Sequence, residues 1–328
     1  MQPASDAYNA HRAERRFSRW LLWLVFAGST AGTLIALAAR WHWVAELFSH
    51  YRFHYLLAQA LLLLVFLNTR RPGWLALTLL LALPNAWYVG PYLLPVFREA
   101  VAGAPRPARA QLLAVNLSFR NHDYQAMLDY LRASRPELMV LSEYTPAWHA
   151  ALSDALADYP YRVLRPRRTP FGIAVYSRRP LRQPEVLDLG APGAENLRLR
   201  VDLAGQPVEL YAVHLYSPAS AQRAAWRRTQ LRRLAAALRD RPYPRLVVGD
   251  LNLTPFSPLF TDLLRDSGLM DARRRAGLHV TWPASPLPLW IPIDHCLADV
   301  AAGVVSVRAG PDLGSDHFPL EVSLADVS

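Results

Sequence analysis

The sequence contains no lysine, and its 36 permanently basic residues are all arginine. A complete replacement of lysine by arginine follows more simply from a GC-rich coding bias than from a need to bind phosphate. The formal net charge of +10 still favours contact with polyanions or anionic lipid head groups. Each basic residue near an anionic bilayer contributes about 1 kcal/mol to the free energy of membrane binding. Solvated faces and arginines beside membrane spans account for most of this charge.

Cysteine is almost absent as well. The single residue, Cys296, excludes an intramolecular disulfide and a cysteine-based zinc site. It lies in an apolar run typical of a strand, where a small buried side chain is expected rather than a nucleophile. The presence of a single thiol therefore does not show whether the protein works in a reducing or an oxidising compartment of the cell.

Hydrophobic residues make up 52% of the chain, and most of the excess precedes residue 100. The stretch Trp20–Ala39 is uncharged and, at about 20 residues, long enough to cross a bilayer core of about 30 Å. A cleaved signal peptide is the alternative, but the run is long for one and further apolar segments follow. A second segment, between Arg52 and Arg70, is near the lower length limit. A third, Trp74–Phe97, is interrupted by Pro84, Asn85 and the pair Gly90 and Pro91. We expect about three transmembrane helices.

The arginines are distributed unevenly between the loops. Only Arg40 and Arg52 lie between the first and second spans, whereas more arginines precede the first span or separate the second from the third: Arg12, Arg15, Arg16, Arg19, Arg70 and Arg71. The positive-inside rule places the N-terminus in the cytoplasm, and three spans deliver the rest of the chain to the other side. The prediction is a multi-pass protein of the cell (inner) membrane with an extracytoplasmic C-terminal domain.

Gly28 and Gly32 have the GxxxG spacing that lets a second helix approach closely. Self-association through these glycines is one interpretation. Small residues are common in membrane helices, so chance is the simpler explanation.

The pattern changes after the Pro/Ala/Arg-rich segment near residues 98–111. We divide the chain into a membrane region (1–100), a linker (101–110) and a soluble domain (111–328). In the last, short apolar runs alternate with helical stretches, and Ala204–Gln206 is expected to form a hairpin turn. The expected strands are Leu112–Leu117, Leu138–Ser142, Phe171–Ser177, Leu197–Leu203, Val208–Leu215 and Leu246–Val248, and the expected helices are Tyr124–Ser134, Ala147–Leu156 and Ser220–Arg239. This mixture indicates two sheets packed face to face between helical layers.

Six short segments place carboxylates, amides or histidines directly after apolar, strand-like runs, as in α/β enzyme sites assembled from strand ends. They are Val115–Asn116, Val140–Glu143, Ala212–His214, Gly249–Asn252, Ile293–His295 and Gly314–His317. Any one of them is a weak signal. Together, in this order, they are a strong one.

This succession resembles the endonuclease/exonuclease/phosphatase superfamily, over about Leu112–Leu324. The resemblance implies an α/β fold, a four-layered sandwich of two packed mixed β-sheets flanked by helices, here preceded by the membrane helices. It also implies hydrolysis of a phosphoester with Mg²⁺ or Mn²⁺. Glu143 matches the metal-binding glutamate, with Asn116 and Asp316 on the metal side. Carboxylates and substrate oxygens are the ligands that Mg²⁺ prefers.

Asp250 and Asn252 match a pair in which the aspartate deprotonates the attacking water and the asparagine holds the phosphate. Residues two apart in an extended segment point to the same side, which suits this pairing. A simple turn with an asparagine cap is the alternative. Asp294 and His317 match a carboxylate that supports a phosphate-contacting histidine, whereas a structural role is expected for His295.

His214 matches a histidine that assists the leaving oxygen or binds phosphate. Because some branches of the family use a nearby tyrosine, Tyr216 remains an alternative. Trp282 matches a segment near the substrate, although a tryptophan is more often part of a core.

The resulting hypothesis is a membrane-anchored phosphoesterase that acts on nucleic acid or a phospholipid head group. The alternative is a catalytically silent, membrane-tethered binding or scaffold module of the same fold. The complete set of matched residues argues against a silent copy.

Overall fold

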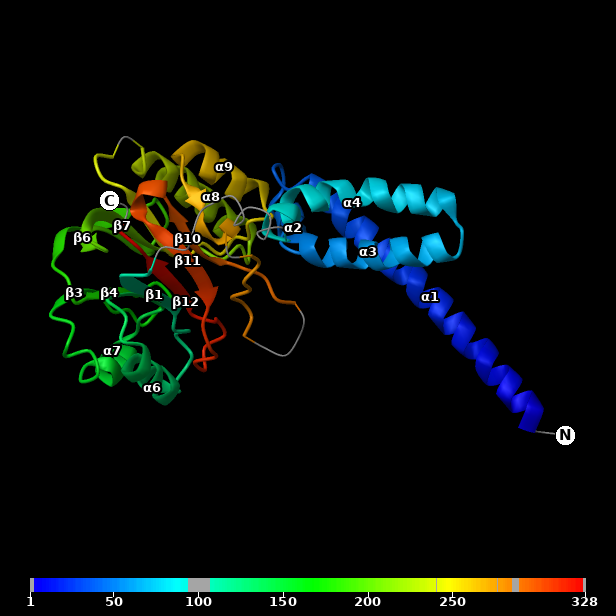
Figure 1. Cartoon of the computed structure of the whole chain (residues 1–328), viewed down its shortest axis with the longest axis horizontal. Coiled ribbons are helices and arrows are strands. Elements are labelled where there is room, and N and C mark those ends of the chain that lie inside the picture. The colour runs from blue at the N-terminus through cyan, green and yellow to red at the C-terminus, as the bar shows by residue number, and fades with distance from the viewer. Residues whose placement is uncertain (1–2, 94–106, 240, 276, 285–288, 327–328) are drawn as a thin grey trace. The chain divides into compact units, whose positions relative to one another are not determined.

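The computed structural model describes residues 3–93, 107–239, 241–275, 277–284 and 289–326 (Figure 1). The chain divides into two compact units, Met1–Gly90 and Pro91–Ser328. Most of the predicted linker lies outside the described residues, so its limits stay a prediction.

The first unit is helical, as its apolar segments predict. Its helices are α1 (Pro3–Leu37), α2 (Trp43–Ser49), α3 (Arg52–Asn68) and α4 (Pro72–Leu93). Two segments, Arg19–Leu37 of α1 and the whole of α4, are long and apolar enough to cross a membrane. The helices α2 and α3 meet at a bend of 55° and would supply a third span if they cross as one. The helix α4 continues through Pro84 and Asn85 without a break.

Helix α3 runs back along α1. At one end, the ring centroid of Trp23 lies 4.7 Å from that of Trp74 and 6.2 Å from that of Phe66. At the other end, Arg52 Nη2 donates to Ala36 O at 2.9 Å. Because Trp23 contacts Phe66 near the end of α3, whereas Ala36 near the end of α1 contacts Arg52 at the start of α3, the two helices are antiparallel.

Gly32 is the site of a close approach within this unit. A Cβ atom at Gly32 would lie 2.4 Å from Cζ of Tyr55, so the α3 tyrosine packs directly on the glycine. Gly28 has nothing within 4 Å. The close packing predicted for this pair is therefore used inside the chain at Gly32, and self-association through Gly28 stays a prediction.

Four buried polar side chains connect the helices, and we call them the interhelical polar cluster: Thr33, Arg52, Gln59 and Asn85. Asn85 Nδ2 donates to Thr33 Oγ1 at 2.8 Å and to Gln59 Oε1 at 3.0 Å. Arg52 Nη1 donates to Asn85 Oδ1 at 3.3 Å, and its guanidinium lies 4.4 Å from the Tyr88 ring centroid. Polar groups inside a helical bundle are thereby satisfied by one another.

The second unit contains two six-stranded mixed sheets. The first has the order β11 (Val304–Ala309), β12 (Leu320–Leu324), β1 (Ala110–Asn116), β2 (Leu138–Ser142), β4 (Ile173–Ser177) and β3 (Tyr161–Arg165). The second has the order β5 (Leu181–Asp188), β6 (Glu195–Leu203), β7 (Gln206–His214), β8 (Arg245–Asp250), β10 (Asp294–Ala298) and β9 (Met270–Asp271). Among the strands of the described residues, β1 with β2 and β7 with β8 pair in parallel, and the other pairs are antiparallel.

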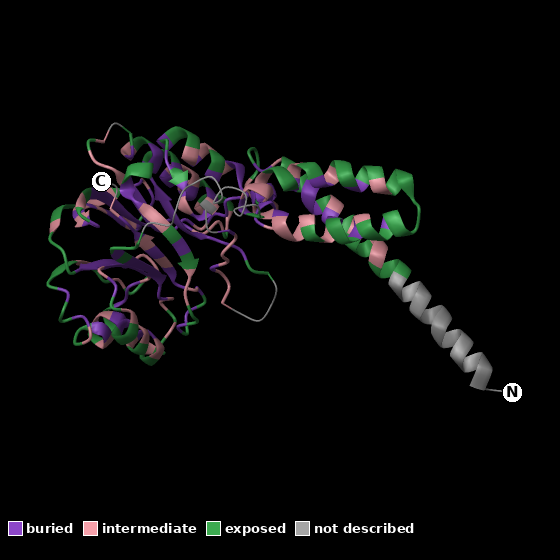
Figure 2. Cartoon of the chain, in the orientation of Figure 1, coloured by how far each residue is buried: buried purple, intermediate pink, exposed green. Residues whose placement is uncertain are grey.

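Three apolar layers hold this unit together. One lies between the sheets and includes Leu112 and Val248. A second packs the first sheet against α6 (Tyr124–Ser134) and α7 (Pro146–Leu152), and a third packs the second sheet against α8 (Ala221–Ala237) and α9 (Pro258–Ser267). Two short 3₁₀ helices, η1 (Ala272–Arg275) and η2 (Val300–Ala302), complete the unit. Figure 2 shows the buried strands between exposed helix faces. The four-layered α/β sandwich is confirmed.

Local signals explain several element boundaries. The β6–β7 hairpin turns at Ala204 and Gly205, both with positive φ (50° and 88°), as a two-residue primed turn requires. The helix α8 begins after Ser220, whose hydroxyl accepts from Arg223 N. The helix expected to reach Leu156 ends at Leu152.

Candidate active site

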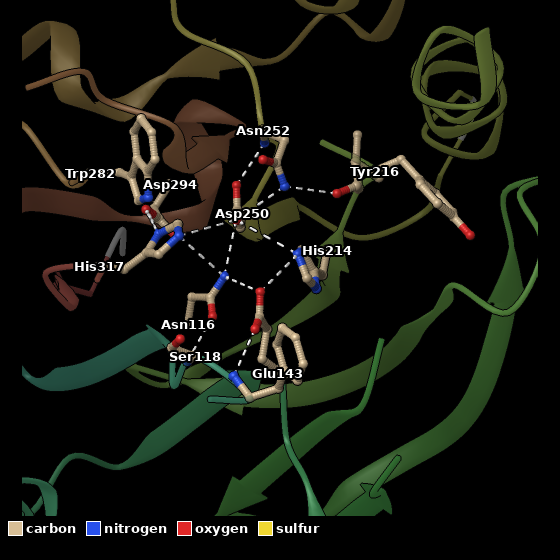
Figure 3. A network of polar contacts seen from close by, with 12 residues as sticks. Asn116, Ser118, Glu143, His214, Tyr216, Asp250, Asn252, Trp282, Asp294 and His317 are labelled. Atoms are coloured by element: carbon tan, nitrogen blue, oxygen red, sulfur yellow. Dashed lines mark hydrogen bonds and ion pairs between the residues drawn. The ribbon is translucent and has the colours of Figure 1, made fainter. Parts of the chain in front are cut away.

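Strand register brings the predicted polar residues to one edge of both sheets. Asn116 pairs with Ser142, directly before Glu143, at the carboxyl ends of β1 and β2. In the second sheet, Asp250 pairs with His214 on one side and with Asp294 on the other. Residues far apart in sequence therefore meet in a single polar network (Figure 3).

Asn116 connects the two sheets. Its Nδ2 lies 3.3 Å from Glu143 Oε1, 3.1 Å from Asp250 Oδ2 and 3.4 Å from His317 Nε2. Its Oδ1 accepts from Ser118 N at 3.1 Å, and the side chain is buried. The two N–H groups of one amide thus fix the relative positions of two carboxylates.

Glu143 is a carboxylate that burial has largely removed from water. Its side chain is 15% exposed, and burial raises its pKa although the backbone N–H of Phe119 donates to Oε2 at 2.8 Å. Among the described residues no arginine lies within salt-bridge distance, and the nearest basic atom is His214 Nε2 at 3.9 Å. A desolvated carboxylate without a permanent positive partner suits a divalent cation.

Asp250 lies at the centre of the network. Its Oδ1 accepts from Asn252 N at 2.7 Å, and Oδ2 accepts from Asn252 Nδ2 at 3.2 Å. Burial, followed by the negative charge of Asp294, raises the pKa of Asp250 to about 6. The preceding Gly249 has φ of 134°, and a Cβ there would lie 2.0 Å from Val213 O, so this tight strand end requires glycine.

His317 and Asp294 form a buried pair. His317 Nδ1 lies 2.9 Å from Asp294 Oδ2, and its Nε2 is 3.8 Å from Asp250 Oδ2. Burial alone would lower the pKa of His317, but the charge and hydrogen bond of Asp294 override it and raise the pKa to about 10. His317 is therefore a cation at neutral pH and can present an N–H from Nε2 to an anion.

The structure distinguishes His214 from Tyr216. His214 Nε2 lies between Glu143 and Asp250, at 3.9 and 3.7 Å from their nearest oxygens. Burial lowers the pKa of this imidazole, and Asp250 opposes the effect. The Tyr216 hydroxyl instead donates to Pro192 O at 2.6 Å and points away from the carboxylates (Figure 3). The histidine, and not the tyrosine, faces the network.

The remaining predicted residues lie at the rim or beneath the site. Trp282 Nε1 donates to Asp316 Oδ2 at 3.3 Å, and the Asp316 side chain is exposed. His295 is fully buried and lies 2.6 Å from Leu253 O through Nε2, while Arg273 contacts its Nδ1. The structural role expected for His295 agrees with these contacts.

Geometry alone offers a second candidate metal site besides the predicted Glu143, Asn116 and Asp316. Single ligand atoms of Asp250, Asp294 and His317 lie within 4.8 Å of one another. A protonated imidazole cannot be a ligand, however, so an ion there would have to displace the proton that Asp294 favours on His317. The chemistry of the donors therefore favours the side of Glu143.

Sequence reasoning missed several supporting residues. Arg227 is not among the predicted site residues, but it is buried, and its guanidinium donates to Asn252 O. Its spacing of four from Leu231, on the buried stripe of α8, was an available signal. Thr281 Oγ1 accepts from Asp294 N at 3.1 Å, and Ser315 Oγ donates to Asn116 O at 2.7 Å. Hydroxyl groups of this kind give no sequence signal.

Solved structures of other proteins share this fold. The TDP2 of D. rerio, crystallised with a single strand DNA product, is 17% identical, with 65% of this chain and 98% of that chain covered at a TM-score of 0.55. An endonuclease/exonuclease/phosphatase from Beutenbergia cavernae is 22% identical, with 67% and 72% covered at a TM-score of 0.53. A beta toxin mutant from Staphylococcus aureus with bound magnesium ions is 17% identical, with 66% and 99% covered at 0.51.

No curated protein matches this chain. The model of the Endonuclease/Exonuclease/phosphatase family matches residues 113–317, which include every predicted site residue. That match covers more than half of the sequence and confirms the resemblance read from its motifs. The chain belongs to the Endonuclease/Exonuclease/phosphatase family.

Proposed function

We propose that this protein is a membrane-anchored, divalent-metal-dependent phosphodiesterase in which water attacks phosphorus in line with the leaving oxygen. One observation carries the proposal. Three carboxylates, those of Glu143, Asp250 and Asp294, lie in one largely buried network with the protonated His317, and no arginine of the described residues forms an ion pair with them. Such a surplus of desolvated negative charge suits a cation and a phosphate held together.

Glu143, assisted by Asn116 and Asp316, would hold Mg²⁺ or Mn²⁺. When bound, the ion neutralises negative charge on the phosphate oxygens. The magnesium ions in the beta toxin structure support this choice of metal. Asn116 also keeps the Glu143 carboxylate fixed relative to Asp250 through its bonds to both.

Asp250 is the proposed general base. A pKa near 6 leaves it ionised at neutral pH yet basic enough to accept a proton from water. Asn252 has a left-handed φ of 50°, and Arg227 and Leu215 hold its backbone and side chain. A phosphate oxygen would replace Asp250 Oδ2, at 3.2 Å, as the acceptor of one of the amide N–H groups of Asn252.

The two histidines have different tasks. His317, kept protonated by Asp294, donates to a non-bridging phosphate oxygen and stabilises the negative charge of the transition state. His214, on the other side of Asp250, is positioned to donate a hydrogen bond from its ring to the leaving oxygen. Trp282 lies at the rim, where it contacts the substrate.

The decisive test is Mg²⁺-dependent hydrolysis of bis(p-nitrophenyl) phosphate by the full chain in detergent. We expect turnover by the wild type and none by Glu143→Gln, which removes a ligand charge at constant volume. Glu185→Gln, at an exposed residue paired with Arg198, is the matched control. A wild type that is folded but inactive with Mg²⁺ or Mn²⁺ would instead identify a silent scaffold module.

We also propose that the N-terminus is cytoplasmic and the enzymatic unit extracytoplasmic. Arg52 is buried in the interhelical polar cluster and is no longer a loop charge, which sharpens the arginine asymmetry in favour of this orientation. The antiparallel course of α1 and α3 supports three spans. Alkaline phosphatase fused after Ser328 should be active. An inactive fusion, with a fluorescent cytoplasmic reporter bright at the same position, would mean an even number of spans.

A further inference from the structure

Two arginines at the rim of the site each lie over an aromatic ring. The guanidinium carbon of Arg120 is 5.2 Å from the Phe119 ring centroid, and that of Arg223 is 5.5 Å from the Tyr216 ring centroid. Stacking on a ring restricts the orientation of a guanidinium and leaves its edge available to an anion. We call these the two stacked arginines.

Each stacked arginine is joined to the proposed chemistry through its own ring residue. Phe119 donates its backbone N–H to Glu143 Oε2 at 2.8 Å. Tyr216 follows Leu215, whose carbonyl accepts from Asn252 Nδ2 at 2.9 Å. In Figure 3, Ser118, which precedes Phe119, and Tyr216 lie at opposite edges of the network, with Asp250 between them. Arg120, in the loop after β1, and Arg223, in the first turn of α8, therefore flank the site from different elements.

Their charges are also uncompensated. Many other arginines of this unit have a carboxylate partner, as Arg132 has in Asp129 at 2.9 Å and Arg182 in Asp202 at 3.4 Å. Within the part of the chain that the structure describes, neither Arg120 nor Arg223 has a carboxylate within 4.0 Å. The Nε of Arg223 also lacks a hydrogen-bond partner there.

We propose that the two stacked arginines bind the phosphates on either side of the scissile phosphate, so that the substrate is a single-stranded polynucleotide. This inference rests on the proposed phosphodiesterase function and names its substrate class. A phospholipid with one phosphodiester has no flanking phosphates and would leave both arginines unused. A polynucleotide supplies a phosphate at each neighbouring position.

Aromatic surface beside Arg223 fits the same substrate. The Tyr216 ring centroid lies 4.3 Å from that of Phe171 and 4.9 Å from that of Trp226, and the last two rings are half-buried. Stacking on such rings tolerates any base sequence, and it accompanies basic backbone contacts in proteins that bind single strands. Phe171 also lies 5.7 Å from the His214 ring, which places this surface on the leaving-group side.

The test compares two substrates of the full-length protein in detergent with Mg²⁺. One is a single-stranded oligonucleotide of about ten nucleotides, and the other is bis(p-nitrophenyl) phosphate, which has no flanking phosphates. We divide kcat/KM for the oligonucleotide by kcat/KM for bis(p-nitrophenyl) phosphate. In Arg120→Ala and in Arg223→Ala this ratio should fall about tenfold, because KM for the oligonucleotide rises. The salt dependence of log KM should weaken by about 0.7 per arginine. Arg132→Ala, on a paired and 65% exposed arginine, should change neither substrate.

An unchanged ratio in both variants would overturn the inference, as would a wild type that hydrolyses phosphatidylcholine or sphingomyelin vesicles in preference to the oligonucleotide. A wild type that fails on bis(p-nitrophenyl) phosphate would contradict the proposed function instead. Fluorescence anisotropy of a labelled oligonucleotide then still tests the arginines. Binding that weakens about tenfold in Arg120→Ala and Arg223→Ala supports the inference, and equal binding refutes it.

Discussion

The two units of this protein each bury a polar network, and the networks differ in charge. In the helical unit, the interhelical polar cluster has one charged member, Arg52, which donates to a backbone carbonyl and to Asn85 and lies over Tyr88. In the second unit, several carboxylates surround one protonated imidazole. In the first network the four side chains are joined by hydrogen bonds, and among the described residues only Arg52 Nε of this cluster lacks a partner. The second still has negative charge that a bound ion would balance.

This difference separates a structural role from a chemical one. Buried polar groups that satisfy one another fix the positions of helices, and losing one leaves its partners unsatisfied. Like charges held together in a desolvated site cost stability and are retained where they carry function. Substitutions in the two networks should therefore have opposite consequences for stability and for activity.

The largest effect is expected for Asp250→Asn. The amide keeps the shape of the side chain but cannot accept a proton from water, so kcat on bis(p-nitrophenyl) phosphate should fall by about 10² to 10⁴. Because an ionised Asp250 beside Asp294 has a raised pKa, its charge costs stability above about pH 6. The metal-free variant should therefore unfold at pH 8 at a temperature no lower than the wild type.

Asp202→Asn, at a half-exposed aspartate on the far hairpin, is the control and should leave both quantities unchanged. A loss of activity smaller than tenfold in Asp250→Asn would mean that Asp250 only shapes the turn and that the base lies elsewhere. A large drop in unfolding temperature would place Asp250 in a closed network like that of the helical unit.

The sequence predicts several members of the carboxylate network, but it does not predict the contacts between them or the polar cluster of the helical unit. Strand-end motifs identify Glu143, Asp250 and His317, because polar residues after apolar runs stand out. The motifs do not show that Asp250 and Asp294 are neighbours, since strand pairing across more than 40 intervening residues decides it. In the helical unit the sequence even misleads. From the sequence, Arg52 is counted as a charged residue of an exposed loop. In the structure it is buried, and its guanidinium donates to Asn85 of α4.

Coupling between Asp294 and His317 is the next largest effect. Alanine at either position should lower kcat by about 10² to 10³, the range found when a preorganised transition-state donor is removed. The pair acts as one unit, because Asp294 keeps His317 protonated. The double alanine variant should thus be less than about tenfold worse than the poorer single variant. Losses that simply multiply would show that the two residues act independently, and circular dichroism would verify that all three variants fold.

A smaller effect, on stability alone, is expected for Asn85→Leu in the helical unit. The substitution leaves Gln59 Oε1 and Arg52 Nη1 without the partner that Asn85 provides. We expect a loss of about 1–2 kcal/mol in unfolding free energy in detergent, with hydrolysis by the still-folded protein unchanged. Asn68→Leu, at an exposed asparagine that ends α3, is the matched control. Equal stability of Asn85→Leu and the wild type would show that the cluster is dispensable.

The smallest effect is the stabilisation of the second unit by Mg²⁺. A ligand that binds only the folded state adds RT ln(1 + [L]/Kd), or about 1 kcal/mol at five times Kd, which is about 2–4 °C in unfolding temperature for a unit of this size. The rise should be present in wild type and Glu185→Gln, should vanish on adding EDTA, and should be absent in Glu143→Gln. In Asn85→Leu the rise should be unaltered, because the interhelical polar cluster offers no carboxylate.

A rise that persists in Glu143→Gln would move the ion to the Asp250, Asp294 and His317 group, whose atoms lie close enough to hold one. His317 would then have to lose its proton to become a ligand, so the rise would grow steeply with pH, and titrating it between pH 6 and pH 9 would distinguish the two sites.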